Sequence, residues 1–387
     1  MFIEVAVSAF LIWVVWYISN TWIKKRGMPP GPFPLPWIGN IPQVMSNQQF
    51  LFENLSNEYG DIFTAFLPNG TFVVINTASL ARQARLSARN DFAGRSSESS
   101  YPLELIFEKD VGFSDYSPGY LFRKKIERAK EIKKLLFLPE FFAHRETYTP
   151  GVTRDLTDSF IAAYEKEIAK ETGKDIGSIE DIPNLMLDFA SGGFDTTAAT
   201  ICWFLLHVVL RQEIQAKLHK EIDSVVKNDR LPCWQDAQNM PFLQATLCEV
   251  MRTSGPVPAT ATTAIRDTNV AGYHVPKNTI LFLNINQIHY DIREWTEPNE
   301  FKPERFLDEE GKFVGWTARH AFMPFGLGRR ECLGQQLAKV TMFVFASTLL
   351  HHYKFELPEG AEKPDVLPTG LQVHRPKDFT LVAKKRH

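Results

Sequence analysis

The sequence has little cysteine and almost no net charge. Its 387 residues include four cysteines, at positions 202, 233, 248 and 332, and no two of them form a C-x-x-C pair. This spacing argues against a zinc site or a disulfide framework and favours a reducing compartment. The formal net charge is −2, so no overall basicity indicates nucleic-acid binding. We find no internal repeat and no low-complexity tract.

Hydrophobic residues make up 44% of the chain, which is enough to bury a substantial core in one large domain or two small ones. Helical periodicity dominates from about residue 103 to residue 250. Short strand pairs are predicted at 62–75, 268–283 and 371–384. Their expected turns are Pro68-Asn69-Gly70, Pro276-Lys277-Asn278 and Pro376-Lys377. The predicted fold class is therefore mainly α with small β-sheets.

The first segment is apolar and aromatic from Phe2 to Ile23, and Lys24-Lys25-Arg26 follows it directly. About twenty such residues are enough to cross a bilayer. The positive charges follow the apolar run, whereas in a cleaved signal peptide they precede it. We therefore predict that residues 1–27 are an uncleaved membrane anchor and its basic flank, with the rest of the chain in the cytosol. The proline-rich segment 28–36 predicts a stiff, extended spacer, or else an ordinary proline-rich linker.

A second segment, 325–334, surrounds one cysteine with small, basic and aromatic residues, and an apolar helical pattern follows it. A metal-ligating sulfur is deprotonated, and a helix N-terminus together with Arg329 and Arg330 stabilises that negative charge. Glycines at 326, 328 and 334 let the backbone approach a ligand closely and donate to the sulfur. The segment therefore predicts that Cys332 is a metal ligand; the plain alternative is a buried free cysteine in a glycine-rich turn.

The predicted helix from Pro183 to Leu210 is about 40 Å long at roughly 1.5 Å per residue. Its centre reads Gly192-Gly193-Phe194-Asp195-Thr196-Thr197, although each glycine costs about 1 kcal/mol relative to alanine. Glycines permit a flat ligand or dioxygen to lie against the backbone, and an acid followed by an alcohol provides a proton relay. Two alternatives are a membrane span, disfavoured by Asp188 and Asp195, and a plain core helix.

A further pair of motifs indicates a structural brace. Glu249 and Arg252 are three residues apart on one predicted helix face, which suits an ion pair. About fifty residues later, Arg305 in Pro303-Glu304-Arg305-Phe306 supplies a second guanidinium for the same carboxylate. A buried carboxylate needs such partners, so we assign these three residues a folding role.

These motifs together resemble the cytochrome P450 family over nearly the whole chain. The pattern F-x-x-G-x-R-x-C-x-G, carried by Phe325, Gly328, Arg330, Cys332 and Gly334, resembles the haem-thiolate loop of that family. The glycine, acid and threonine run resembles its oxygen-activation motif, and the brace resembles its E-x-x-R and P-x-R-F elements. The anchor followed by P-P-G-P is similar to the microsomal members, among them steroid hydroxylases and drug-metabolising enzymes.

This resemblance implies a haem-thiolate monooxygenase with haem b bound by Cys332, in a catalytic domain spanning residues 28–387. Phe325, Gly328, Arg330 and Gly334 would surround the haem, and Asp195 with Thr196 would deliver protons. The implied substrate is small and apolar, such as a steroid, lipid or xenobiotic. Electrons would come from NADPH through cytochrome P450 reductase, with cytochrome b5 as a further partner, at the endoplasmic reticulum membrane. A haem-thiolate isomerase or dehydratase is less expected, because Asp195 and Thr196 are both retained.

The sequence departs from this family pattern in its basic residues. The family's W-x-x-x-R becomes Tyr120 and Lys124, so Lys124 is the residue expected to pair with a haem propionate, as a point charge. Thr260 and Thr262 stand near a position where a histidine is often found. The basic run from Arg123 to Lys134 is either a solvated helix face or a docking surface for an acidic reductase.

A larger departure is the spacing. Between the early basic helix and the long helix, the chain is short by on the order of a hundred residues for a domain of this class. The suspected internal deletion lies near 126–142, and it would remove part of the helical roof over the substrate. The rival prediction is therefore a truncated, catalytically silent, membrane-anchored haem-binding product of the same family.

Overall fold

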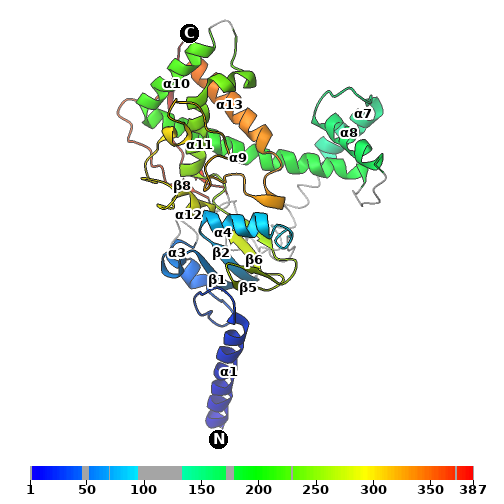
Figure 1. Ribbon diagram of the computed structural model, residues 1–387, viewed down its shortest axis with the longest axis vertical. Coiled ribbons are helices and arrows are strands. Elements are labelled where there is room, and N and C mark those ends of the chain that lie inside the picture. The colour runs from blue at the N-terminus through cyan, green and yellow to red at the C-terminus, as the bar shows by residue number, and fades with distance from the viewer. Residues whose placement is uncertain are drawn as a thin grey trace. The chain divides into compact units, whose positions relative to one another are not determined.

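The computed structural model describes residues 2–45, 52–68, 70–94, 133–170, 178–227, 230–370 and 373–386. The chain divides into two compact units, one comprising Met1–Phe107 with Ala198–His387 and the other Glu108–Thr197. Helices dominate both units, and strands form small sheets in the first, as the sequence predicted (Figure 1).

The chain begins with helix α1 (Phe2–Lys25). By length and composition, two helices among the described residues are suited to crossing a membrane. One is Ile3–Lys25, with mean hydropathy 1.6 and none of its window buried, and the other is Ile179–Leu210, with 44% of its window buried. Burial of the second is what a core helix shows, so α1 is the predicted anchor.

The prediction of an extended spacer after α1 is wrong. The segment that follows Met28 turns back, and Leu35 and Gly39 pair in an antiparallel bridge. The Tyr17 hydroxyl of α1 donates a hydrogen bond to the Pro34 carbonyl at 2.8 Å, and the rings of Trp13 and Trp37 stack 5.3 Å apart. Proline prevents helix continuation, but it does not prevent packing against donors and aromatic rings on the preceding helix.

The main sheet has the strand order β1-β2-β6-β3, with β1 (Ile62–Leu67), β2 (Gly70–Ile75), β6 (Ile280–Leu283) and β3 (Thr260–Thr263) (Figure 1). The hairpin predicted at 62–75 is confirmed, since β1 and β2 pair antiparallel. β2 then pairs parallel with β6, across about two hundred residues of sequence. Alternate residues face two separate cores: Phe63 and Val74 pack in one, and Val73 and Ile75 pack in the other.

Two other strand predictions need correction. In 268–283 the hairpin joins β4 (Thr268–Val270) to β5 (Tyr273–Val275), whereas β6 enters the main sheet. The hairpin expected at 371–384 does not form among the described residues. Instead β9 (Arg375–Pro376) pairs with β8 (Pro368–Thr369), and β10 (Val382–Lys385) pairs with β7 (Tyr353–Glu356). Strands this short are decided by distant partners rather than by their own turn residues.

Helices of the first unit enclose its two cores, the first two of them packing on the smaller core and the others on the larger. They are α2 (Ile41–Val44), α3 (Glu53–Tyr59), α4 (Ala78–Arg82), α10 (Gln212–Val225), α11 (Pro241–Ser254), α12 (Ile285–His289) and α13 (Gln335–His352). α4 continues into a π-helical turn, η1 (Gln83–Ser87). α10, α11 and α13 pack together around buried residues such as Leu218, Leu247 and Phe343 (Figure 1).

The second unit contains the π-helical turn η3 (Lys133–Phe137), α7 (Leu138–Thr147), α8 (Leu156–Ile168) and the 3-10 turn η4 (Ile179–Asp181). The long helix predicted at 183–210 is confirmed as α9 (Ile182–Leu210), whose residues up to Thr197 belong to this unit. Phe141, Ile161 and Ile182 form its small buried core.

A histidine connects α7 to α8. His144 Nε2 lies 2.6 Å from Asp155 Oδ2, and Nδ1 lies 2.9 Å from the Glu140 carbonyl oxygen. Burial alone would lower the pKa of His144, but the Glu140 carbonyl and the Asp155 carboxylate outweigh it, so the pKa is raised. Asp155 also caps α8 by accepting from Thr157 N and Asp158 N. The contact therefore favours a protonated His144.

Candidate functional site

The loop that carries Cys332 is closed by its own backbone. Cys332 N donates to the Phe325 carbonyl at 2.8 Å, across a 3-10 turn, η7 (Gly328–Arg330). The Cys332 thiol is free and exposed, and α13 begins at Gln335, three residues later. The sulfur is therefore exposed and lies just before a helix N-terminus, and its role as a metal ligand stays a prediction.

Glycine is required at two positions of this loop. Gly326 and Gly328 have φ of +72° and +75°, a region that side chains with a Cβ rarely adopt. A Cβ on Gly328 would also lie 2.2 Å from the backbone oxygen of Arg85. A Cβ on Gly334 would lie 3.9 Å from Cys332 Sγ, which is an ordinary contact distance. Gly328 therefore holds the loop against η1, and Gly334 lies beside the sulfur.

The two arginines before Cys332 attach the loop to the segment that follows η1. Arg329 Nε donates to Asn90 Oδ1 at 2.6 Å, and Arg330 Nε donates to the Ala93 carbonyl at 2.7 Å. That segment is in turn joined to β3, because Gly94 and Thr263 exchange backbone hydrogen bonds. The stretch 90–94 thus borders the cysteine loop and links it to β3.

Two buried polar atoms beside the loop have no hydrogen-bond partner among the described residues. One is Nε of Arg85, a residue only 4% exposed, and burial lowers the pKa of this guanidinium to about 10. The other is Nε1 of Trp316, whose ring centre lies 6.2 Å from that of Phe325 in the loop. Unpaired buried donors of this kind are costly and indicate a missing acceptor.

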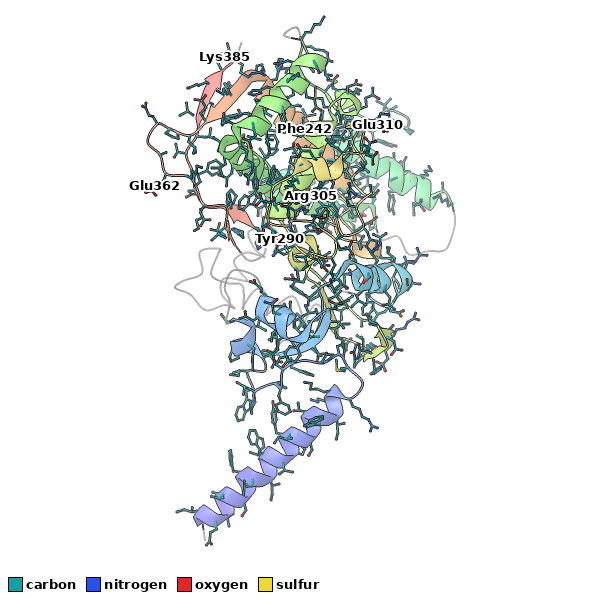
Figure 2. All side chains as sticks on the ribbon, turned by 60° about the vertical axis from the view of Figure 1, so that its left-hand side comes forward. Phe242, Tyr290, Arg305, Glu310, Glu362 and Lys385 are labelled. Atoms are coloured by element: carbon teal, nitrogen blue, oxygen red, sulfur yellow. The ribbon has the colours of Figure 1, made fainter. Side chains whose placement is uncertain are left out.

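The predicted brace is confirmed. Arg252 Nε and Nη2 each lie 2.8 Å from an oxygen of the Glu249 carboxylate, and both side chains are fully buried. Arg305 Nε donates to the same carboxylate at 3.3 Å, and Lys302 N donates to it at 2.8 Å. Arg305 and Tyr290, which stands beside Arg252, are labelled in Figure 2. The brace makes no direct contact with the cysteine loop in any of these hydrogen bonds.

A histidine that sequence reasoning missed connects the brace to the residues just before the cysteine loop. The His289 carbonyl accepts from Arg252 Nη1 at 2.9 Å, and His289 Nε2 accepts from Met323 N at 3.1 Å. Burial, and then the Arg252 charge, lower the pKa of His289 to about 3, so the ring is neutral and can accept. Lys339 was also missed: it is buried, and its Nζ lies 5.4 Å from the centre of the Phe325 ring. Neither residue has a motif of its own.

The acid and threonine motif lies in the second unit. Asp195 and Thr196 are part of α9, which is continuous through both glycines. Thr196 Oγ1 donates to the Gly192 carbonyl at 2.8 Å, as expected for a threonine that bonds back to the preceding turn. A Cβ on Gly192 or Gly193 would meet no atom within 4 Å, so packing does not require either glycine. Lys124 and most of the basic run 123–134 lie outside the described residues.

The other three cysteines differ from Cys332. Cys248 is fully buried, and burial raises the pKa of its thiol well above the usual value. Burial also raises the pKa of Cys202. The Cys233 thiol is already engaged, since it donates to Asp236 Oδ2 at 3.4 Å. Cys332 is therefore the cysteine best suited to bind a metal.

A mainly helical fold, an exposed cysteine before a helix and a buried Glu–Arg brace are together the features of haem-thiolate monooxygenases. The sequence model of the family described as Cytochrome P450 matches residues 29–118 and 113–382. The chain therefore belongs to the cytochrome P450 family.

Individual relatives support this assignment. Cytochrome P450 2D6 of Pan paniscus is 38% identical over 499 residues, covering 99% of this chain and 98% of the relative. Cytochrome P450 1B1 of Mus musculus is 26% identical over 486 residues, covering 95% and 89%. A zebrafish cytochrome P450 structure with abiraterone has TM-score 0.72 at 23% identity, covering 87% of this chain and 98% of that one. Both sequence alignments are longer than the chain, which is shorter than these relatives.

Family membership makes the chain a monooxygenase with haem as its cofactor, and NADPH acting through a reductase is the electron source typical of the family. The residues present fit that group. Cys332 offers an exposed sulfur, and Arg85 and Arg330 border the same loop with guanidinium donors suited to carboxylates such as haem propionates. The agreement between these residues and haem lies in the kinds of ligand and donor atoms that they offer.

Proposed function

We propose that this chain is a membrane-anchored haem-thiolate monooxygenase in which Cys332 binds the haem iron. The observation that carries the proposal is the exposed Cys332 thiol, in a loop closed by its own hydrogen bond to Phe325 and bordered by buried, unpaired donors. A thiolate ligand from Cys332 would increase electron donation to the iron of that group. The bound haem supplies the activation of dioxygen, from which one atom enters the substrate.

Residues around Cys332 would hold the cofactor in place. Arg330, already fixed by its bond to the Ala93 carbonyl, would face a propionate, and Gly328 would keep the loop against η1. Phe325, held by the Lys339 ammonium, would pack against the haem, and Gly334 would leave the sulfur accessible. Lys124 is proposed from the family pattern as a further propionate partner.

We assign proton delivery to Asp195 and Thr196. The carboxylate of Asp195 would take a proton from solvent, and the hydroxyl of Thr196 would pass one on. The Thr196 proton is directed at the Gly192 carbonyl, so the hydroxyl must rotate away from α9 before it donates. The expected substrate is small and apolar, such as a steroid, lipid or xenobiotic.

The redox partners and location are proposed from the microsomal relatives. Electrons would pass from NADPH through cytochrome P450 reductase, with cytochrome b5 as a second partner. α1 would fix the chain in the endoplasmic reticulum membrane as a single span, with residues 28–387 in the cytosol. The family pattern includes no nucleic-acid partner.

The assignment of Cys332 as the protein ligand of the haem iron is tested by spectroscopy. The reduced carbon-monoxide complex of the full chain should show the red-shifted Soret band of a thiolate ligand. Cys332→Ala should abolish this band, whereas Cys233→Ala, which changes another exposed cysteine, should retain it. Cys202→Ala and Cys248→Ala should retain it as well. A thiolate band that persists in Cys332→Ala would refute the assignment.

The shortness of the chain favours one second candidate, a catalytically silent haem-binding product of the same family. Relatives align over more positions than this chain contains. Missing residues would leave apolar surface open to water, and an open site admits water to the reacting centre. The decisive measurement is the ratio of product formed to NADPH consumed with a competent reductase. Tight coupling supports the enzyme, and NADPH oxidation without product supports the silent form.

A further inference from the structure

The second unit brings three side chains that can bind a metal together between α7 and α8. Glu140 and His144 are four residues apart on α7, and Asp155 is the N-cap of α8. Each offers one ligand atom, and these three atoms lie within 4.8 Å of one another. No second group of this kind occurs among the residues that the structure describes. α7 and α8 pack against each other (Figure 1), so the cluster bridges two helices.

The His144 ring has the orientation of a metal-binding histidine. Nδ1 lies 2.9 Å from the Glu140 carbonyl oxygen, which can only accept, so Nδ1 carries a hydrogen and donates it. Nε2 then points at Asp155 Oδ2, 2.6 Å away. Histidines that bind metals commonly donate their other N–H to a backbone carbonyl, because this fixes the ring and its tautomer. Without a proton or a metal cation between them, Nε2 and Oδ2 would be two acceptors facing each other.

The start of α8 holds the Asp155 carboxylate in position. Its Oδ1 accepts from Thr157 N at 2.9 Å and from Asp158 N at 3.2 Å, which leaves Oδ2 for His144. The Glu140 side chain is 58% exposed, and its Oε1 lies 3.2 Å from His144 Nδ1. Zinc binds nitrogen and oxygen at about 2.0–2.2 Å, so the ligand atoms of a tetrahedral ion are about 3.4 Å apart. The His144 to Asp155 contact must therefore open slightly, and the exposed Glu140 carboxylate must turn toward Nε2.

The charges around the cluster favour a cation. Two carboxylates and a neutral imidazole provide two negative charges, and the neighbouring guanidinium groups each have a carboxylate of their own. Arg154 binds Asp158 through Nε at 2.7 Å and Nη2 at 2.8 Å, and Arg145 binds Glu180 at 3.2 Å. An imidazole ligand selects zinc over calcium or magnesium, which prefer oxygen ligands.

The second unit also has little else to hold it together. Among the described residues, its buried apolar core consists of Phe141, Ile161 and Ile182. Units with small cores commonly depend on a metal ion or another cross-link for their stability. A metal bound only by the folded state stabilises that state.

We propose that Glu140, His144 and Asp155 bind a zinc ion that cross-links α7 to α8, with water as the fourth ligand. Zinc takes the place of the proton between His144 Nε2 and Asp155 Oδ2. The side chains of Glu140 and Asp155 are 58% and 45% exposed, so the ion exchanges with solvent. The rigidity of the second unit then follows the zinc concentration. This inference does not depend on haem or on the proposed reaction.

The first test counts zinc on the full chain after treatment with a chelator and equilibrium dialysis against Zn²⁺. His144→Gln and Asp155→Asn should each bind one zinc ion fewer per chain than the unaltered protein. Asparagine is itself a good N-cap, so Asp155→Asn keeps the start of α8. Glu146→Gln is the matched control, because Glu146 is an exposed carboxylate on the same helix outside the cluster, and its zinc count should not change.

The second test locates the bound ion by amide hydrogen exchange, which also shows without zinc whether each variant is folded. At a zinc concentration 100 times the dissociation constant, exchange through separation of α7 from α8 should slow about a hundredfold. Glu146→Gln should show the same slowing, and His144→Gln should show none. Equal zinc counts for His144→Gln and the unaltered protein would overturn the proposal. Zinc uptake without slower exchange in α7 and α8 would show adventitious binding elsewhere and overturn it as well.

Discussion

Replacing Glu249 with glutamine should destabilise the first unit far more than the loss of an exposed carboxylate would. The Glu249 carboxylate is fully buried and accepts four hydrogen bonds, two from Arg252 and one each from Arg305 and Lys302 N. Glutamine keeps one acceptor oxygen but turns an amide NH2 toward these donors. Arg252, also fully buried, then loses the charge that balances its own.

The expected cost follows from that burial. Removing one partner of a buried ion pair costs about 3–5 kcal/mol, because the other charge stays in a low-dielectric interior. The total stability of a domain is about 5–15 kcal/mol. Glu249→Gln should therefore remove a large share of the stability and lower the yield of haem-loaded protein.

The assay is urea unfolding of the haem-loaded chain, followed by the Soret absorbance. Glu304→Gln is the matched control, since Glu304 pairs with Lys217 at 2.8 Å with both side chains more than half exposed. A surface pair of this kind contributes at most about 1 kcal/mol. If Glu249→Gln unfolds at the same urea concentration as Glu304→Gln, the buried brace does not contribute the stability that we assign to it.

Three further predictions concern the loop, the long helix and the second unit. Gly328→Ala should weaken the thiolate Soret band, because its Cβ would lie 2.2 Å from the Arg85 backbone oxygen at φ +75°. Gly193→Ala should stabilise the protein by about 1 kcal/mol and so raise its thermal midpoint. The same variant should lower substrate turnover if a ligand lies against that glycine. His144→Gln should remove a pH dependence of amide exchange in α7 and α8. Because the pKa of His144 is raised in the folded protein, protonated His144 stabilises their contact below about pH 6.5, and this stabilisation is lost as the pH rises through the folded pKa.

Two of these predictions have a control variant, and the third has an outcome that would refute it. Gly272→Ala shares the positive φ, at +81°, but meets no atom within 4 Å, so the Soret band should be unchanged. A Gly193→Ala protein with unaltered turnover would refute close approach of a ligand at that glycine. His320→Gln removes a half-exposed histidine 3.7 Å from Glu294, and it should leave the exchange of α7 and α8 as pH-dependent as before.

Sequence patterns predicted the parts of the site that are built from fixed local spacing. Cys332 and its glycines lie within ten residues, and Glu249 and Arg252 lie one helical turn apart, so the spacing itself determines which side chains can meet. The meeting with Arg305 could be predicted because a buried carboxylate needs several donors. These predictions are confirmed in the structure as geometry, while their chemical roles stay predictions.

Structural features that depend on contacts with residues far away in the sequence could not be predicted in the same way. The proline-rich segment folds back because Tyr17 and Trp13 of α1 receive it, and nothing in its own composition specifies those contacts. β10 pairs with β7, nearly thirty residues earlier, and the expected turn at Pro376-Lys377 does not decide its partner. Arg85 reads as an ordinary surface residue of a helix, yet a π-helical turn buries it against Gly328.

The parallel pairing of β2 with β6 has a consequence for how this family tolerates insertions and deletions. Ile75 and Ile280 belong to adjacent strands, and the two stretches matching the family model adjoin near residues 113–118, within the connection between them. The entropy of closing such a connection grows only with the logarithm of its length. Extending it from about 200 to about 300 residues costs only about 0.4 kcal/mol. The main sheet can therefore form with a connection of either length. Natural selection on the length of this connection then acts through the surfaces that the additional residues cover.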